Sequence, residues 1–584
     1  MGEPSPGMLP PTRPQESRLD SWKEIATYLH RDVKTVQRWE KREGMPVHRH
    51  QHDKAGSVYA FSSELEAWSQ SRRLRLEVKE EEPIADPPAD EKVDVPQTRT
   101  SRARLWLVLG VVAVLALIAV TSVMLRVRAG HTTQPKITSL AVLPLNNLSG
   151  DPTQEYLADE MTEELCGRLA RIHDLRVISR TSVMRFKGTK LSVPEIARTL
   201  GVDALVEGSV IRQGNRIRVH AQLIRASTDE HVWSDEYDGE LGDVLALESE
   251  VAQSIARRVE VKVTGEERAR LVASHHISPE AYESYLKAED ELGKGEVEKS
   301  IAYFEEAIGE DPNFAPAYVG LASVYDMLGT LRVGAPPNEV RPKLISAARK
   351  ALELDPELAE PHVLLADVYQ KQWQWSDADA EYKRALELNP NDATAHERFA
   401  VWLLCQGRTD EALAWVQRAR ELDPLGGAGI THGWILFHAR RYDEAVRELR
   451  SVHATDHWYL GLALIANGQP DEAIPVLEKA LSQNDHSPAV MGVLVRAYAH
   501  AGRRAEALRL VEELKRRQQK GYVTSAAFVN AYLGIDDNEQ ALVWLERACQ
   551  EQSNILQLIK VHPFFDPLRS DPRFQELIHR VGLG

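Results

Sequence analysis

The sequence predicts a multidomain protein made of a small winged helix-turn-helix, one transmembrane helix, an α/β sandwich and an all-α repeat solenoid. Three observations predict this order. An apolar run lies at residues 105–125, two short amphipathic helices precede it, and similar segments recur about every 34 residues in the C-terminal half. A chain of 584 residues also has room for several domains at the usual size of roughly 150 residues each.

Composition excludes several classes of protein. The formal net charge is -16 at pH 7, so any contact with nucleic acid must be local. The three cysteines form no C-x-x-C pair, which argues against a disulfide scaffold and a structural metal. The sequence therefore predicts no cofactor and no metal site.

Residues 1–19 are rich in Pro, Gly and Ser and are predicted to form a disordered leader. A domain over residues 20–75 follows. Ser21 and Glu24 match the S-x-x-E capping box, and the helix they begin has one apolar face, made of Trp22, Ile25, Ala26 and Leu29. A second helix is expected from Val33 to about Glu43, with Asp32 as its N-cap.

The second helix is polar and basic on the face opposite Val36 and Trp39. Segments 47–52 and 57–61 alternate like a hairpin, and residues 62–73 return as a helix. Two short helices followed by a hairpin and a helix are typical of a winged helix-turn-helix. The other interpretation is a small helical domain with a solvated charged face.

The segments SWKEIATYLHRDVKTVQRWEKREGMPVHRH and VYAFSSELEAW resemble the MerR-type or excisionase-like winged helix-turn-helix family. The resemblance implies binding of double-stranded DNA with the second helix in the major groove. Arg38 and Gln37 suit contacts with base edges, whereas the lysines suit phosphates. The predicted DNA-binding residues are Lys34, Thr35, Gln37, Arg38, Lys41, Arg42, Arg49 and Lys54.

Three histidines, His48, His50 and His52, alternate along the first wing strand. Such a run could ligate a metal or respond to acid pH, but a solvated strand edge is the favoured interpretation.

Residues 76–104 form an acidic, Pro-rich linker that cannot bury a core. The run 105–125 would span roughly 31 Å as a helix, which matches a hydrocarbon core of about 30 Å. A buried helix of a soluble domain is the less favoured alternative. Because flanking Lys and Arg number four before and three after the run, charge does not orient it. The DNA-binding domain instead predicts a bacterial inner-membrane protein with a cytoplasmic N-terminus and periplasmic C-terminal domains.

Residues 136–262 alternate strand and helix patterns in the order β-α-β-α-β-β-β-α, which predicts an α/β sandwich. A helix is expected over 192–200 and strands over 204–211, 216–223 and 230–237. The phrases AVLPLNNLSGDPTQEYLADEMTEEL, RVISRTSV and HVWSDEYD are similar to the TolB amino-terminal-like domain, which implies an interaction or sensing module. The acids of the first helix could bind a cation, but a solvated first turn is favoured. These acids are Asp159, Glu160, Glu163 and Glu164.

Residues 278–550 repeat with a period near 34, which indicates about eight tetratricopeptide repeats. The recurring small residues are Ala378, Ala412, Ala445, Ala473, Ala507 and Ala541. An insertion lies at 329–341 and a shortened unit near Ala454. The tryptophans are expected to be mostly core, and Cys405 and Cys549 to be buried. Residues 551–584 are predicted to cap the stack.

Together these features predict a membrane-tethered transcription regulator that senses a protein or peptide partner in the repeat groove, with a homodimer as one route to control. The alternative is a periplasmic interaction scaffold anchored in the inner membrane. No nucleotide-binding or nucleophile motif occurs, so the chain is not expected to be an enzyme.

Overall fold

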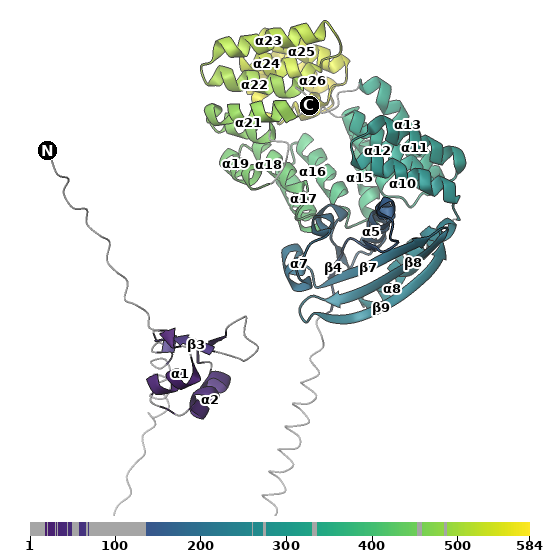
Figure 1. Ribbon diagram of the computed structural model, residues 1–584. Coiled ribbons are helices and arrows are strands. Elements are labelled where there is room, and N and C mark those ends of the chain that lie inside the picture. The colour runs from purple at the N-terminus through teal and green to yellow at the C-terminus, as the bar shows by residue number, and fades with distance from the viewer. Residues whose placement is uncertain are drawn as a thin grey trace, which may run out of the picture. The chain divides into compact units, whose positions relative to one another are not determined.

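The computed structural model describes residues 18–19, 21–29, 31, 33–43, 45–49, 58–62, 64–65 and 68 of the N-terminal part. In the remainder it describes residues 136–259, 261–272, 276–329, 336–452, 458–483 and 487–584. The chain forms two compact units, Met1–His131 and Thr132–Gly584 (Figure 1).

The first unit contains the predicted pair of helices, α1 (Trp22–Tyr28) and α2 (Val33–Glu43). The Ser21 hydroxyl accepts a hydrogen bond from the Glu24 backbone N–H at 3.2 Å, which is the expected N-cap. β2 (His48–Arg49) pairs antiparallel with β3 (Val58–Phe61), as the hairpin pattern predicts. The core of this unit comes from both helices, the strands and the segment after β3, and it includes Ile25, Ala26, Val36, Trp39, Met45, Val58, Ala60 and Leu65.

A third strand of this sheet departs from the prediction. β1 (Arg18–Leu19) pairs antiparallel with β3, so the strand order is β1-β3-β2. The predicted leader therefore ends before residue 18, because the backbone of Arg18 and Leu19 completes the ladder of β3. Residues 1–17, the linker 76–104 and the predicted span 105–125 lie outside the described residues. Among the residues that are described, no helix is long and apolar enough to cross a membrane.

The second unit begins with a mixed sheet. Its path is β6-β4-β7-β8-β9, and β5 also pairs with β7. β4 is parallel to both β6 and β7, whereas β7, β8 and β9 form an antiparallel meander. The strands are β4 (Ser139–Val142), β5 (Asn146–Asn147), β6 (Arg176–Val177), β7 (Ala204–Gln213), β8 (Arg216–Arg225) and β9 (Glu230–Glu240).

Two helices, α5 (Glu155–Ala170) and α8 (Val244–Arg258), pack side by side against this sheet. Along most of β8, buried residues such as Ile217 and Val219 alternate with more exposed ones, as in a sheet covered on one face. α7 (Val193–Leu200) lies where a helix is predicted. The short elements β5, α6 (Arg180–Val183) and α9 (Gly265–Arg270) were not predicted, because they are too short to show a period.

The rest of the chain is a helical solenoid of tetratricopeptide repeats. Helices α10 to α25 form eight consecutive pairs, in agreement with the predicted number of units. All six alanines that define the period have no exposed surface, because they lie where neighbouring helices approach most closely. The helices are α10 (Pro279–Gly293), α11 (Val297–Glu310), α12 (Ala315–Leu328), α13 (Pro337–Leu354), α14 (Glu360–Lys371), α15 (Trp375–Leu388), α16 (Ala393–Cys405), α17 (Thr409–Leu422), α18 (Ala428–His438), α19 (Tyr442–Ser451), α20 (Trp458–Ala466), α21 (Pro470–Gln483), α22 (Pro488–His500), α23 (Arg504–Gln518), α24 (Ser525–Gly534) and α25 (Asn538–Gln550).

The irregular units also lie where the spacing places them. α13 has 18 residues and begins within the predicted insertion at 329–341, of which residues 330–335 lie outside the described part. α18, α19 and α20 have only 11, 10 and 9 residues, which matches the shortened period.

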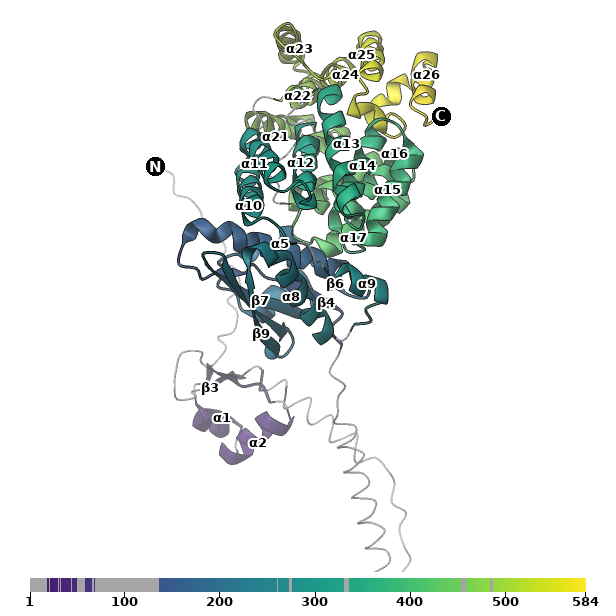
Figure 2. The ribbon, with the colours of Figure 1, turned by 90° about the vertical axis from the view of Figure 1, so that its right-hand side faces the viewer.

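The sheet and the first repeats share one hydrophobic core, which extends from Ile137 to Val368. α5 lies between the sheet and the repeats (Figure 2). The predicted boundary between an α/β domain and a repeat domain is therefore a boundary in sequence pattern only, because packing continues across it.

The C-terminal segment does more than cap the stack. Its elements are η4 (Asn554–Leu558), η5 (Pro563–Leu568) and α26 (Pro572–Arg580), and residues 552–583 are called the tail below. α26 packs on α25, as a cap would. Together, the two short helices before it contact α25 as well, but also α14, α16 and α24, so the tail reaches back to the earlier repeats. The predicted cap thus describes α26, but not the two short helices before it.

Candidate functional site

The first candidate surface is the outer face of α2. Lys34 and Arg38 are exposed and one helical turn apart, whereas Val36 and Trp39 are buried on the opposite side. Thr35 and Gln37 are half-buried. The core contacts of α2 therefore leave its basic face outward, which is the arrangement that a recognition helix requires.

The side chains of the other four predicted DNA-binding residues lie outside the described part of the chain. Lys41 and Arg42 belong to α2 and Arg49 to β2, but their side chains lie outside the description, as does Lys54.

The wing histidines were predicted to lie on a solvated strand edge. His48 Nε2 lies 2.8 Å from a Glu64 carboxylate oxygen, and its ring stacks on Tyr59 with centroids 5.1 Å apart. His50 and His52 fall outside the described residues. No group of three His, Cys, Asp or Glu side chains suited to a metal occurs in the part of the chain that is described.

The acids of α5 do not form a solvated first turn, which corrects the prediction. Asp159 pairs with Lys187 at 2.5 Å, Glu163 with Arg180 at 3.1 Å, and Glu164 with Arg168 at 2.8 Å. Glu160 is buried and accepts a hydrogen bond from the Tyr285 hydroxyl at 2.8 Å. The sequence pattern missed this because Tyr285 belongs to a repeat helix, α10, which packs on α5 only in the folded chain.

The carboxyls between the sheet and the first repeats form a cluster that is called the acidic seam below. It consists of Glu160, Glu163 and Glu164 of α5, Glu248 of α8 and Glu289 of α10. Burial raises the pKa of Glu160 and Glu248 well above the ordinary value, and raises that of Glu289 to about 8, with further contributions from neighbouring acids. Glu248 is 1% exposed, and its carboxylate has no hydrogen-bond partner among the described residues, with only the Arg168 guanidinium near it at 3.9 Å. The seam is thus stable when several of its carboxyls are protonated.

The side chain of Asn391 also joins the sheet region to the repeats. The Asn391 side-chain amide donates to the carbonyls of Ala170, Ile172 and Leu175 at 3.0, 3.1 and 2.8 Å. It thereby satisfies carbonyls at the C-terminal end of α5, which no residue of that helix could reach.

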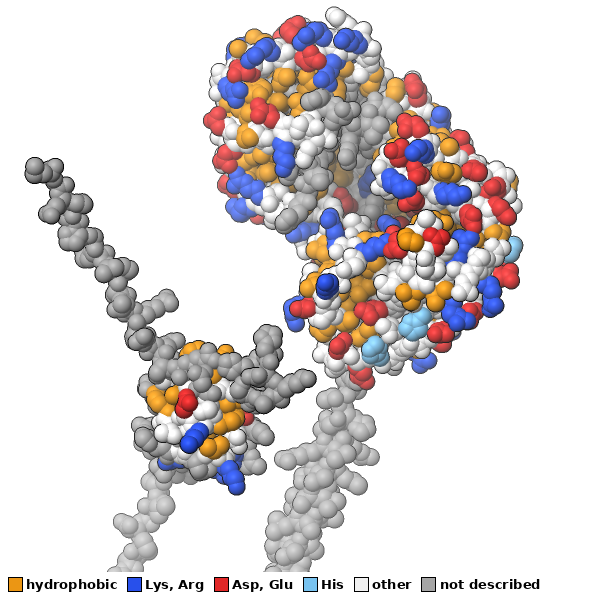
Figure 3. Space-filling model, in the orientation of Figure 1, with side chains coloured by type: hydrophobic (Ala, Val, Ile, Leu, Met, Phe, Trp, Pro, Cys, Tyr) orange, Lys and Arg blue, Asp and Glu red, His pale blue; other side chains and the backbone are white. Residues whose placement is uncertain are grey.

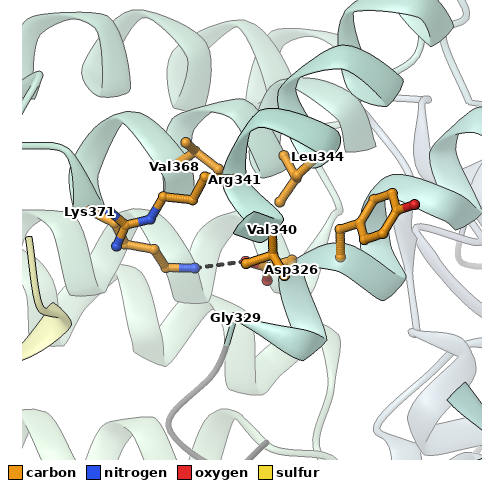
Figure 4. A pocket seen from close by; sticks show the side chains of 8 residues that line it. Asp326, Gly329, Val340, Arg341, Leu344, Val368 and Lys371 are labelled. Carbon is orange, nitrogen blue, oxygen red and sulfur yellow. Dashed lines mark hydrogen bonds and ion pairs between the residues drawn. The ribbon is translucent and has the colours of Figure 1, made fainter. Parts of the chain in front are cut away.

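The second candidate surface is the inner face of the curved repeat array, where a hollow is lined by α12, α13 and α14 (Figure 4). Lys371 Nζ pairs with Asp326 at 2.7 Å. Arg341 turns toward the tail and donates to the Gln552 carbonyl and the Asn554 side chain, both at 3.1 Å. The remaining lining residues are Tyr325, Gly329, Val340, Leu344 and Val368.

Direct hydrogen bonds continue along the tail. Gln370 donates to the Gln557 side chain at 2.8 Å, and the Trp375 indole N–H donates to the Val581 carbonyl at 2.8 Å. Further on, Arg440 binds Asp566 through two contacts of 2.5 and 2.7 Å. The tail is therefore held by repeats two, three and five.

The most buried part of this contact is aromatic. The ring of Phe564 meets that of Phe437 edge-on at 5.6 Å, and the rings of His562 and His438 meet at 5.0 Å. The Arg496 guanidinium lies 3.9 Å from the Phe564 ring centroid. Burial lowers the pKa of His438 to about 4, so both histidines fit this apolar contact in their neutral form.

Sequence reasoning missed the path of the tail, although one signal was present. The run HPFFDPL holds two adjacent aromatic residues, more apolar surface than a polar-faced cap needs. Phe564 and Phe565 are both buried.

Other side chains of the array follow the prediction that they are core. Trp402 is buried, and Trp373, Trp375, Trp415 and Trp434 are partly buried against the core clusters. All three cysteines are buried thiols, and burial raises the pKa of Cys166 to about 12. On the visible face of the repeats, charges of both signs are interspersed (Figure 3).

Comparison with known proteins identifies the repeats. Family models described as tetratricopeptide repeat match residues 363–426 and 464–527. A curated relative, "Putative adenylate cyclase 3" of Rhizobium meliloti (strain 1021), is 32% identical over 237 residues, which are 40% of this chain and 40% of the relative. The chain thus matches about two fifths of the length of that relative.

Solved structures of repeat proteins match about a third of this chain, each with a low TM-score. A chain of the APC/C hetero-tetramer Cut9–Hcn1 is 19% identical, and the match covers 37% of this chain and 43% of that chain, with a TM-score of 0.33. A thermophilic TPR protein of Thermus thermophilus has 16% identity, coverage of 34% and 99%, and a TM-score of 0.27. YrrB, a TPR protein with an unusual peptide-binding site, has 25% identity, coverage of 35% and 88%, and a TM-score of 0.21.

Proposed function

We propose that this chain is a membrane-tethered transcription regulator whose N-terminal unit binds double-stranded DNA. The observation that carries the proposal is the outward basic face of α2, on which Lys34 and Arg38 lie opposite the buried Val36 and Trp39. In a helix-turn-helix this is the face that enters the major groove. The family resemblance of residues 20–75 supports the same assignment.

The C-terminal part contains tetratricopeptide repeats, which indicate protein–protein interaction. The proposal places these repeats and the sheet in the periplasm, the span at 105–125 in the inner membrane and the head in the cytoplasm, because a DNA-binding domain works only on the cytoplasmic side. A partner that associates two chains would bring two heads to two half-sites, which converts weak single-site binding into specific binding.

The proposed activity does not include catalysis. The named activity of the Rhizobium meliloti relative belongs to a protein of which this chain matches only 40%. The sequence itself offers no nucleotide-binding or nucleophile motif to support an enzymatic role.

DNA binding of the head is the test. A fragment of residues 1–104 is suitable because its buried residues pack on one another within the first unit. The fragment would be titrated with the upstream region of its own gene across a range of salt concentrations. We expect binding that resists competitor DNA and a log–log salt slope of several units, since each neutralised phosphate contributes nearly one.

Matched variants separate specific from electrostatic binding. Arg38→Ala should cost about 1–3 kcal/mol and relax base preference, because a bidentate base contact is lost. Lys23→Ala removes one exposed positive charge from α1 and serves as the control, with a small and sequence-independent effect. Binding equal to that of random duplex, even after artificial dimerisation of the head, would refute the proposal and favour a membrane-anchored scaffold.

A further inference from the structure

The inner face of the repeat array is occupied by the chain itself. The tail is held by Arg341, Gln370 and Trp375 near its ends, and by Arg440 in its middle. It also enters the core, since Leu558 packs in one cluster with Val363, Ala366 and Trp402 of the repeats. A partner that is to reach these side chains must therefore replace the tail.

The tail fills the groove but leaves two nitrogen atoms of the buried Arg496 side chain without a hydrogen-bond acceptor in the part of the chain that is described. Arg496 is only 6% exposed, and its Nε and Nη2 atoms have no hydrogen-bond partner among the described residues. The ring of Phe564 covers the guanidinium at 3.9 Å, and the charge of Asp536 also acts on it, but without a hydrogen bond to Nε or Nη2. A buried donor that lacks an acceptor costs free energy, so the tail leaves a cation that another occupant could satisfy better.

Charge near this point favours an acidic occupant. Arg440 and Arg569 both bind Asp566, while Arg496 lies close to His562 and Phe564. His438 and His562 are neutral when buried and add no negative charge. Arg440 of the repeats and Arg569 of the tail thus share the Asp566 carboxylate, whereas Arg496 has no ion pair with a carboxylate of the tail among the described residues.

We propose that the tail is an internal ligand of the repeat groove, and that the partner is a peptide segment that places one carboxylate on Arg440 and a second one on Arg496. This rests on the proposed role of the repeats in sensing a protein or peptide partner. The tail supplies the first carboxylate through Asp566 and offers Phe564 where the second belongs. The partner gains over the tail at Arg496, which compensates for the advantage of the covalently attached tail.

The probes are two synthetic peptides added to the full-length protein in detergent. One has the sequence of residues 556–571, and the other carries Phe564→Glu. The wild-type protein should bind both weakly, because only the small fraction of chains with an open groove is competent to bind. Asp566→Arg in the chain places a positive charge beside Arg440 and Arg569 and should tighten peptide binding tenfold or more. Asp566→Ala removes the pair without repulsion and should tighten it about threefold.

The matched control is Glu539→Arg. Glu539 also receives two contacts from one arginine of the tail, Arg573, each of 2.9 Å, but this pair joins α26 to α25. The Glu539→Arg substitution should leave peptide affinity within twofold of wild type. On the opened chain, the Phe564→Glu peptide should bind at least tenfold more tightly than the native sequence. Arg496→Gln, introduced into the same opened chain, should abolish that difference.

Hydrogen exchange of the tail shows whether the groove has opened. We expect residues 552–569 to be protected in wild type and to exchange faster in Asp566→Arg. Equal peptide affinity in all variants overturns the proposal, as does unchanged exchange of the tail in both Asp566 variants. A preference for the native peptide over Phe564→Glu overturns the role of Arg496. None of these outcomes depends on DNA binding by the head.

Discussion

Substitution of Asn391 tests whether the sheet and the repeats are joined by polar contacts as well as by apolar packing. The Asn391 amide carries two protons and serves three buried carbonyls, those of Ala170, Ile172 and Leu175, at 2.8–3.1 Å. Asn391→Ala leaves the Ala170 and Leu175 carbonyls without this donor, in a site where Asn391 is 4% exposed, whereas the Ile172 carbonyl keeps the Leu175 backbone N–H at 3.3 Å. Each unsatisfied buried group costs about 1–3 kcal/mol, so the loss of two hydrogen bonds should destabilise the junction by about 2–5 kcal/mol.

Hydrogen exchange with local resolution is the suitable assay, because unfolding of a unit of this size is not a two-state transition. A loss of about 2 kcal/mol corresponds to an increase of about 30-fold in the exchange rate of amides that open with the junction. Asn391→Asp keeps the shape but replaces the donor by an acceptor, and should destabilise the junction more than alanine does.

The first repeat supplies the control. Asn313 follows a proline before α12, as Asn391 does before α16, but it is exposed. Asn313→Ala should change exchange at the junction by less than about 0.5 kcal/mol. If Asn391→Ala left exchange at the end of α5 unchanged, the Asn391 amide would contribute nothing measurable to the junction and the reasoning would be refuted.

Two further predictions concern the acidic seam and the packing of the last repeats. The folded-state pKa of Glu289 is raised to about 8 from an ordinary value of 4.5, so the folded protein binds more protons than the unfolded chain between these values and loses stability as pH rises through them. Glu289→Gln should therefore melt at a higher temperature than wild type at pH 9 and at a similar one near pH 4, and an identical pH profile would contradict this. At Gly492 of α22, an added Cβ would collide with the Ala527 backbone of α24. Gly492→Ala should destabilise the packing of α22 on α24 by about 1–3 kcal/mol, measured by hydrogen exchange of these two helices, whereas Gly427→Ala, whose added Cβ meets no atom within 4 Å, should not.

Much of the architecture follows from local patterns. The six alanines of the period have no exposed surface, and the eight helix pairs lie in the predicted region, because each repeat carries the same requirement for close packing. The strands β7, β8 and β9 begin at the predicted residues, since alternation of apolar and polar side chains is a local property. Short elements such as β1 and α6 were missed because two to four residues give no period.

The sequence by itself determined the two helices of the head, the order of the sheet elements and the number of repeats. For the helices and strands the signal lies within a few neighbouring residues, and for the repeats it is the same pattern recurring at a fixed period. Only the tertiary structure decided that Glu160 is buried against Tyr285, that Asn391 caps α5, and that the tail fills the groove beside Arg440 and Arg496. These contacts join residues that are far apart in the sequence, so their partners are set by how the helices pack in the folded chain, which no local pattern encodes.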